Sequence, residues 1–107
     1  MTEKSKILIV DDRPENLIAL KKSLEDLEVE FFTATSGDEA LKIILHHQFA
    51  LLILDVMMPG MDGYELAELI RSQNETKEVP LIFLTAMDSS KSSMFKGYQS
   101  GAVDFLF

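Results

Sequence analysis

The sequence predicts a doubly wound α/β fold, in which helices cover both faces of a five-stranded parallel sheet with strand order 2-1-3-4-5. Short apolar segments alternate along the chain with segments whose apolar residues recur at helical spacing. Most of the short segments are apolar on both faces, which is typical of strands that helices cover from both sides. A chain of 107 residues has room for one domain with one hydrophobic core.

The predicted strands are short and evenly distributed along the chain. They comprise residues 6–10, 29–34, 51–55, 80–85 and 102–107. A weakly patterned helix is expected over residues 90–99, before the last strand. It is followed by Gly101, a residue type that suits a C-terminal helix cap.

Three further helices connect the first four strands. The first has Pro14 in its opening turn, which is a favourable position for proline. Its apolar positions at helical spacing are Leu17, Leu20, Leu24 and Leu27. Ser36 and Asp62 each begin a predicted capping box, with Glu39 and Glu65 three residues later. These two capping boxes predict where the second and third helices begin.

Composition and charge exclude several classes of protein. The absence of cysteine excludes disulfides, thiol catalysis and zinc-thiolate sites. A net charge of −8 argues against nucleic acid as a direct partner, because acidic surfaces repel phosphate backbones. The N-terminus is polar, and no apolar stretch reaches the ~20 residues of a membrane helix. We therefore expect a cytoplasmic protein that does not contact a membrane.

Three aspartates follow strands that are neighbours in the predicted sheet. Asp11 and Asp12 come directly after the first strand, and Asp55 ends the third. Ligands bind at the carboxyl ends of such strands, so we expect the three carboxylates to converge there. Carboxylates this close raise one another's pKa unless a cation lies among them. A ligand set made only of oxygen atoms, with no cysteine or histidine nearby, fits Mg²⁺.

A structural role for each of these residues is the main alternative. A single aspartate after a strand is usually a helix cap or turn residue, and Asp12 could serve the helix that begins near Pro14. Asp55 is harder to explain in this way, because it ends an apolar run and is followed by another apolar segment. A carboxylate there could attack a phosphoryl group and form an aspartyl phosphate. Thr85 could aim a hydroxyl at the same crevice, or be an ordinary β-branched strand residue.

Four segments together resemble the response-regulator receiver domain, the phospho-accepting module of two-component signalling. They are residues 7–12 (Ile-Leu-Ile-Val-Asp-Asp), 55–63 (Asp-Val-Met-Met-Pro-Gly-Met-Asp-Gly), 84–86 (Leu-Thr-Ala) and 101–107 (Gly-Ala-Val-Asp-Phe-Leu-Phe). The resemblance covers the whole chain. It implies a flavodoxin-like fold similar to that of chemotaxis regulators, and it implies that residues 1–107 form a single receiver domain.

The same resemblance implies a role for each matching site residue. Asp55 would be the phosphoacceptor, and a histidine kinase or a phosphotransfer protein would supply the phosphoryl group. Asp11 and Asp12 would be acids of the Mg²⁺ site, and the backbone carbonyl of Met57 would be a further metal ligand.

Thr85 and Phe105 would form the switch of such a domain. The Thr85 hydroxyl would move toward the phosphoryl group and vacate space for the Phe105 ring. An ordinary core position is the alternative description of Phe105. The rearrangement would alter the surface of helix 4 and strand 5, here residues 91–107, which contacts partner domains or a second receiver.

The sequence departs from the family at its C-terminal end. The family continues beyond the segment matching residues 104–107 with a lysine, usually a proline, and a fifth helix, whereas this sequence stops at Phe107. We therefore expect a receiver domain that is truncated at its C-terminus and lacks the last helix. The apolar surface normally covered by that helix would favour a dimer or a larger assembly.

Two other functions compete with the signalling switch. A small Mg²⁺-dependent phosphohydrolase would need a second acid two residues after the nucleophile, and Met57 occupies that position. We therefore expect no enzyme activity beyond the domain's own phosphorylation and dephosphorylation. A module that dimerises or binds partners without phosphorylation is the other alternative. Incorporation of phosphate into Asp55 would distinguish all three functions.

Overall fold

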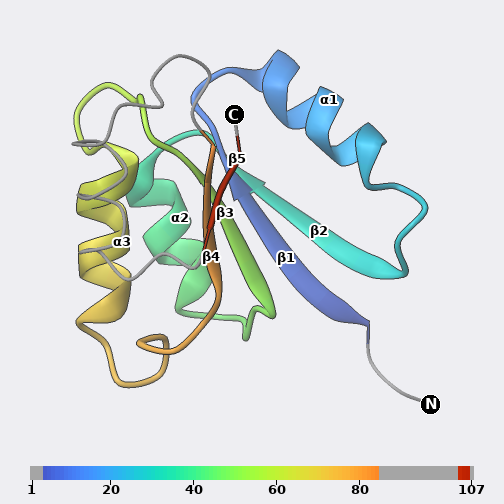
Figure 1. Cartoon of the computed structure of the whole chain (residues 1–107). Coiled ribbons are helices and arrows are strands. Elements are labelled where there is room, and N and C mark those ends of the chain that lie inside the picture. The colour runs from blue at the N-terminus through green and yellow to red at the C-terminus, as the bar shows by residue number, and fades with distance from the viewer. Residues whose placement is uncertain (1–3, 85–103, 107) are drawn as a thin grey trace.

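Five parallel strands form one sheet in the order β2-β1-β3-β4-β5, as predicted (Figure 1). The structure is a computed structural model that describes residues 4–84 and the backbone of residues 104–106. The strands are β1 (Ser5–Val10), β2 (Val29–Ala34), β3 (Leu51–Asp55), β4 (Leu81–Leu84) and β5 (Asp104–Leu106). Each neighbouring pair is parallel, and the register aligns Val10 of β1 with both Ala34 of β2 and Leu54 of β3.

The strand bounds agree closely with the prediction where both can be compared. β4 begins at Leu81 and not at Pro80, although the carbonyl of Pro80 still accepts a hydrogen bond from the Leu52 amide at 3.0 Å. Proline has no amide hydrogen to donate, so it contributes only half of a strand's usual pairing. The predicted strand positions 85, 102, 103 and 107 lie outside the described residues, as does the helix expected over residues 90–99.

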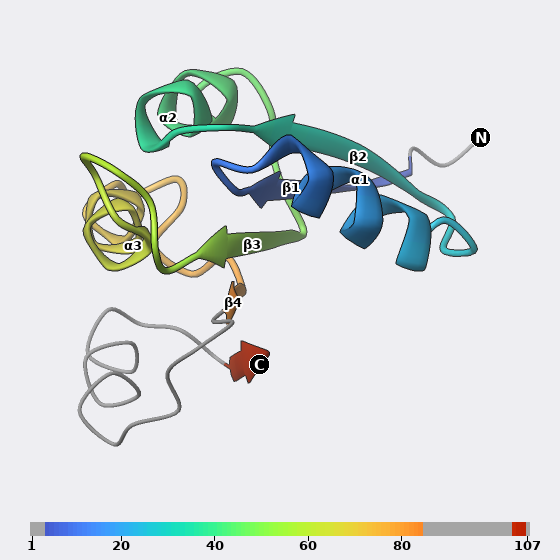
Figure 2. The ribbon, with the colours of Figure 1, turned by 90° about the horizontal axis from the view of Figure 1, so that it is seen from above.

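Helices cover both faces of the sheet, which explains why its strands are apolar on both sides. Helix α1 (Pro14–Ser23) lies on one face, and α2 (Gly37–Ile44) and α3 (Gly63–Arg71) lie on the other (Figure 2). Alternate strand residues serve the two faces. The α1 side buries Ile7, Ile9 and Ile53 with Leu17 of the helix. The α2 and α3 side buries Leu8, Val10, Leu52, Leu54, Leu66, Leu81 and Phe83.

Helix α1 ends earlier than its leucine spacing predicts. Leu24 is the C-terminal cap, and Leu27 lies beyond the helix with 51% of its surface exposed. Lys21 and Lys22 in the last turn complement the negative end of the helix dipole, whereas Glu25 and Asp26 beyond them would oppose it. The chain must also turn within this segment to bring Val29 into register with β1. The predicted extension of the helix to Leu27 was therefore wrong.

One of the two predicted capping boxes is complete and the other is only half formed. At α3, the Asp62 side chain accepts from the Glu65 amide and the Glu65 side chain accepts from the Asp62 amide. At α2, the Ser36 hydroxyl accepts from the Glu39 amide at 3.1 Å. The Glu39 carboxylate, however, accepts from the Thr35 amide at 2.8 Å, one residue before the cap. The carboxylate still anchors the turn that precedes α2, so the helix begins where it was predicted.

No helix in the described part of the chain is both long enough and apolar enough to span a membrane.

Candidate functional site

Three aspartates meet at the carboxyl ends of β1 and β3, the two strands that lie side by side in the middle of Figure 1. The register that pairs Val10 with Leu54 places Asp11 and Asp55 next to each other at the following position. One carboxylate oxygen from each of Asp11, Asp12 and Asp55 lies within 4.8 Å of the others. The structure thus brings together the three acids that the strand order was expected to bring together.

Asp11 is the buried member of this aspartate cluster, with 4% of its surface exposed. Its amide donates to the Ala34 carbonyl at 3.0 Å, which continues the pairing of β1 with β2. Its Oδ1 accepts from the Arg13 amide at 3.0 Å. The side-chain amide of Asn16 donates to Oδ2 at 3.2 Å and lies 3.4 Å from Oδ1. These donors fix the carboxylate and offset part of the penalty for burying its charge.

Asn16 is a site residue that the sequence reasoning missed. It lies in the first turn of α1, five positions after Asp11, and its side chain contacts both oxygens of that carboxylate. A polar residue in the first turn of a helix that directly follows an acidic pair was the available signal. The signal is weak, because the path of the connection decides whether Asn16 faces the strand end or solvent.

Asp55 is held by the turn that follows β3. Its Oδ1 accepts from the Met57 amide at 3.2 Å, a local turn in which an aspartate binds the backbone two residues later. Helix α3 begins directly against the same strand end, and the Gly63 amide donates to the Val56 carbonyl at 3.1 Å. A Cβ atom at Gly63 would overlap the Asp55 carbonyl oxygen and lie 2.9 Å from its carbonyl carbon. Glycine at this position therefore lets the helix approach the backbone of Asp55.

The electrostatic environment raises the pKa of Asp55 from 3.8 to about 6. Burial is the largest cause, because it disfavours the charged carboxylate. The negative charge of Asp11 is the next largest, and the charge of Asp12 and a hydrogen bond with Asp12 act in the same direction. The hydrogen bond from the Met57 amide lowers the pKa and opposes them. Negative charge at this end of the sheet is therefore only partly compensated by the protein itself.

The donor set of the aspartate cluster fits a hard divalent cation. Every side-chain atom of the cluster that could bind a metal is a carboxylate oxygen, and Mg²⁺ prefers such ligands. Among the residues that the structure describes, no lysine or arginine forms an ion pair with Asp11, Asp12 or Asp55. A bound cation would relieve the repulsion that raises the pKa of Asp55.

The remaining predicted site residues are placed only in part. The Met57 side chain is 71% exposed and its amide is bound to Asp55. Thr85 lies outside the described residues. The backbone of Phe105 belongs to β5 and pairs with Phe83 of β4, whereas its side chain is outside the described part of the structure. The proposed roles of these three residues stay predictions.

Comparison with known proteins identifies closely similar domains. Residues 7–107 match the response regulator receiver domain. A probable cyclic di-GMP phosphodiesterase of Vibrio cholerae is 37% identical over 101 residues, which are 94% of this chain but 22% of that protein. This chain thus spans about a fifth of the length of that relative.

Two solved structures extend the comparison to three dimensions. The chemotaxis protein CheY4 of Vibrio cholerae has a TM-score of 0.91 and 33% identity, covering 97% of this chain and 86% of CheY4. The receiver domain of the sensor histidine kinase PA1611 from Pseudomonas aeruginosa has a TM-score of 0.86 and 27% identity, covering 97% of this chain and 84% of that one. The PA1611 structure has a magnesium ion coordinated in its active site cleft.

Proposed function

Because the chain belongs to the response regulator receiver domain family, we propose that it is a phosphorylation-dependent signalling switch with Asp55 as its phosphoacceptor. The observation that carries the proposal is the aspartate cluster, in which a partly exposed Asp55 lies beside Asp11 and Asp12. The phosphoryl group would come from a phosphohistidine of a histidine kinase or a phosphotransfer protein. A dimer or larger assembly stays a separate prediction.

In the proposed reaction, a carboxylate oxygen of Asp55 forms a bond to phosphorus. The bond from phosphorus to the donor nitrogen breaks, and its electron pair stays on that nitrogen. The Met57 amide holds Oδ1, which leaves Oδ2 as the oxygen that attacks. With a pKa of about 6, Asp55 is mostly ionised at neutral pH and can act as the nucleophile.

Asp11, Asp12, Asp55 and the backbone carbonyl of Met57 are the groups that would hold Mg²⁺. The ion, when bound, supplies positive charge that neutralises the phosphoryl oxygens and the attacking carboxylate. Asn16 and the Arg13 amide orient the buried Asp11 from the side of α1. The magnesium ion in the PA1611 receiver structure supports this assignment.

The proposed output of the switch is a change in the surface formed by residues 91–107. A phosphoryl group on Asp55 would attract the Thr85 hydroxyl, and the vacated space would accept the Phe105 ring. The backbone pairing of Asp55 with Leu84 supports this coupling, because Leu84 directly precedes Thr85.

Labelling with a small phosphoryl donor in the presence of Mg²⁺ tests the phosphoacceptor. Asp55→Asn should remove all acid-labile, hydroxylamine-sensitive phosphate, because an amide is a far poorer nucleophile than a carboxylate. Asp38→Asn, which removes the same charge from an exposed position in α2, should retain it. Label on a serine or threonine, for example within residues 89–93, would contradict the proposal.

A titration followed by backbone NMR shifts tests the metal ligands. Asp12→Ala should weaken Mg²⁺ binding by about tenfold or more, since it removes a carboxylate from the cluster. Glu15→Gln removes one negative charge from the exposed first turn of α1 and should change the affinity by less than about twofold. Equal effects of the two substitutions would mean that only net charge attracts the ion, and that Asp12 is not a ligand.

A further inference from the structure

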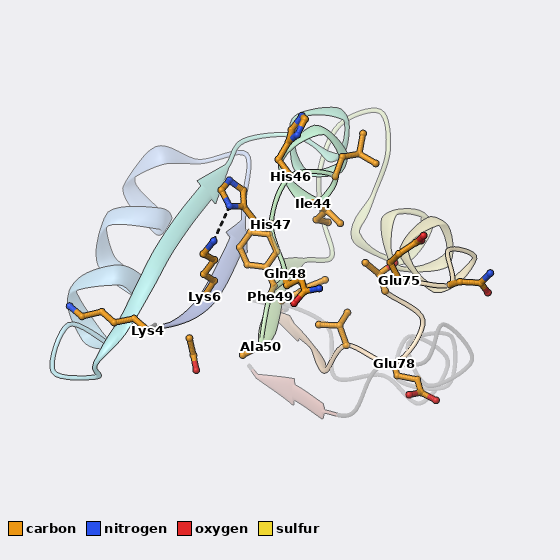
Figure 3. A pocket seen from close by; sticks show the side chains of 16 residues that line it. Lys4, Lys6, Ile44, His46, His47, Gln48, Phe49, Ala50, Glu75 and Glu78 are labelled. Carbon is orange, nitrogen blue, oxygen red and sulfur yellow. Dashed lines mark hydrogen bonds between the residues drawn. The ribbon is translucent and has the colours of Figure 1, made fainter. Parts of the chain in front are cut away.

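A cavity lies at the opposite ends of the strands that carry the aspartate cluster. This cavity has a volume of about 880 Å³ and is lined by Leu52 and by residues from segments 4–6, 44–50 and 74–79 (Figure 3). These segments are the start of β1 and the connections that lead into β3 and β4. The aspartates follow the carboxyl ends of the same sheet, so the cavity has no part in the proposed phosphorylation site.

A partly buried lysine with no acidic partner forms one wall of this cavity. The Lys6 ammonium lies 3.1 Å from Nδ1 of His47 and 5.8 Å from the centre of the Phe32 ring. Neither group carries a negative charge. Within the described residues, no carboxylate pairs with Lys6. Glu30, the register neighbour of Lys6 in β2, is exposed and makes no ion pair with it.

The surrounding rings hold His47 in place beside Lys6. The His47 ring lies 4.4 Å from the Phe32 ring and 6.0 Å from the Phe49 ring, measured between ring centres. An ammonium group can only donate hydrogen bonds, so Nδ1 of His47 is the acceptor in this bond. Lys6 uses one of its three N–H groups in this bond. Two charged N–H donors of Lys6 therefore remain at this wall.

The rest of the cavity restricts the kind of anion that could enter. Phe49 and Val79 supply apolar surface, and the volume lies within the range of about 300–1,000 Å³ that is usual for small-molecule sites. Glu75 and Glu78 come from the side opposite Lys6 (Figure 3). Their charges would repel an extended polyanion, such as a nucleic acid, while leaving room for a single anionic group at Lys6.

From this arrangement we infer a second ligand site for a small organic anion. The phosphate or carboxylate of the ligand binds the Lys6 ammonium, which His47 holds in place, and its compact apolar body lies against Phe49 and Val79. The anion supplies the negative charge that Lys6 lacks, in a place where partial burial strengthens a charge-assisted hydrogen bond.

Phenyl phosphate and benzoate are suitable probes, because each joins one anionic group to one ring. The full chain is titrated without divalent cations, so that the aspartate cluster repels both probes, and binding is followed by backbone NMR shifts. Shifts should be largest in residues 44–50 and 74–79. Stronger binding of phenyl phosphate than of benzoate would assign a phosphate ligand, and the reverse order a carboxylate ligand.

Three variants make the test decisive. Lys6→Met keeps the length of the side chain and should weaken binding about tenfold, whereas Lys42→Met, in α2 and outside the cavity, should have little effect. Glu78→Gln should strengthen binding about twofold by removing a repulsive charge from an exposed position. Unchanged affinity in both Lys6→Met and Glu78→Gln would overturn the inference, as would shifts centred on residues 11, 12 and 55.

Discussion

Gly63→Ala should lower the free energy of unfolding by about 3 kcal/mol, because the added Cβ has no space to enter. It would overlap the Asp55 carbonyl oxygen and lie 3.0 Å from the Cα of Val56. Both neighbours are backbone atoms at the end of a central strand, so they cannot rotate away as a side chain would. The start of α3 would have to move away from β3, breaking the hydrogen bond from the Gly63 amide to Val56. Urea unfolding measured at equilibrium gives the difference directly.

Gly37→Ala is the matched control for this substitution. Gly37 is also a buried first residue of a helix, and it also follows a capping residue. The atoms nearest to its added Cβ belong to the Met61 side chain, with the sulfur at 2.6 Å. The sulfur and Cγ of Met61 can move away by a change of rotamer, and its Cβ, at 3.2 Å, needs to shift by only a few tenths of an ångström. This substitution should therefore lower stability by no more than about 1 kcal/mol. Similar losses at positions 63 and 37 would show that close approach to the Asp55 backbone is not the cause.

Local chemistry explains which parts of the fold could be predicted from the sequence. The apolar runs of β1 and β3 and the cap residues Ser36 and Asp62 act over a few positions, so they are visible in the linear chain. The convergence of the aspartates then follows from strand order alone, since both strands are parallel and adjacent. None of these inferences needs the path of a loop.

The features that could not be predicted depend on the paths of connections between elements. Asn16 reaches Asp11 only because the turn at Arg13 orients the first turn of α1 toward the strand end. Gly63 follows the helix cap Asp62, and its close approach to the Asp55 backbone appears only when α3 is packed against β3. The cavity beside Lys6 combines three segments that are distant in the sequence, and no spacing rule connects them.

The end of α1 shows how tertiary requirements override local spacing. Four leucines at helical spacing predict a helix to Leu27, yet the chain leaves the helix after Ser23. Leu24 still packs against the α1 side of the sheet as a cap residue. The spacing correctly identified residues near the core but not the point at which β2 requires the chain to turn.

Asp55→Asn should increase the free energy of unfolding at neutral pH, even though it removes the proposed phosphoacceptor. Burial and neighbouring negative charges raise the pKa of Asp55 from 3.8 to about 6, so the folded state disfavours the ionised carboxylate. A shift of this size corresponds to about 3 kcal/mol before screening. Asp55 is only partly buried, and solvent reduces the expected gain to about 2 kcal/mol.

The increase in the free energy of unfolding that Asp55→Asn produces should depend on pH in a defined direction. Below the unfolded pKa of about 4, both states hold the proton and the substitution should have little effect. Between pH 4 and pH 6 the unfolded chain ionises first, so the wild-type protein loses stability as the pH rises. Above pH 6 both states are ionised and the full difference from Asp55→Asn should be present. Urea unfolding at pH 4, 5 and 7 with a chelator measures this profile.

A matched variant and added Mg²⁺ separate this effect from a general response to charge. Asp26→Asn removes one carboxylate from the exposed turn after α1 and should change stability by less than about 0.5 kcal/mol at each pH. Mg²⁺ should stabilise the wild-type chain more than Asp55→Asn, because the ion compensates the charge that the substitution removes. The advantage of Asp55→Asn should therefore shrink as Mg²⁺ is added. If its advantage instead stays constant from pH 4 to pH 7, neither burial of the Asp55 charge nor repulsion within the aspartate cluster can be its origin, since both require an ionised Asp55.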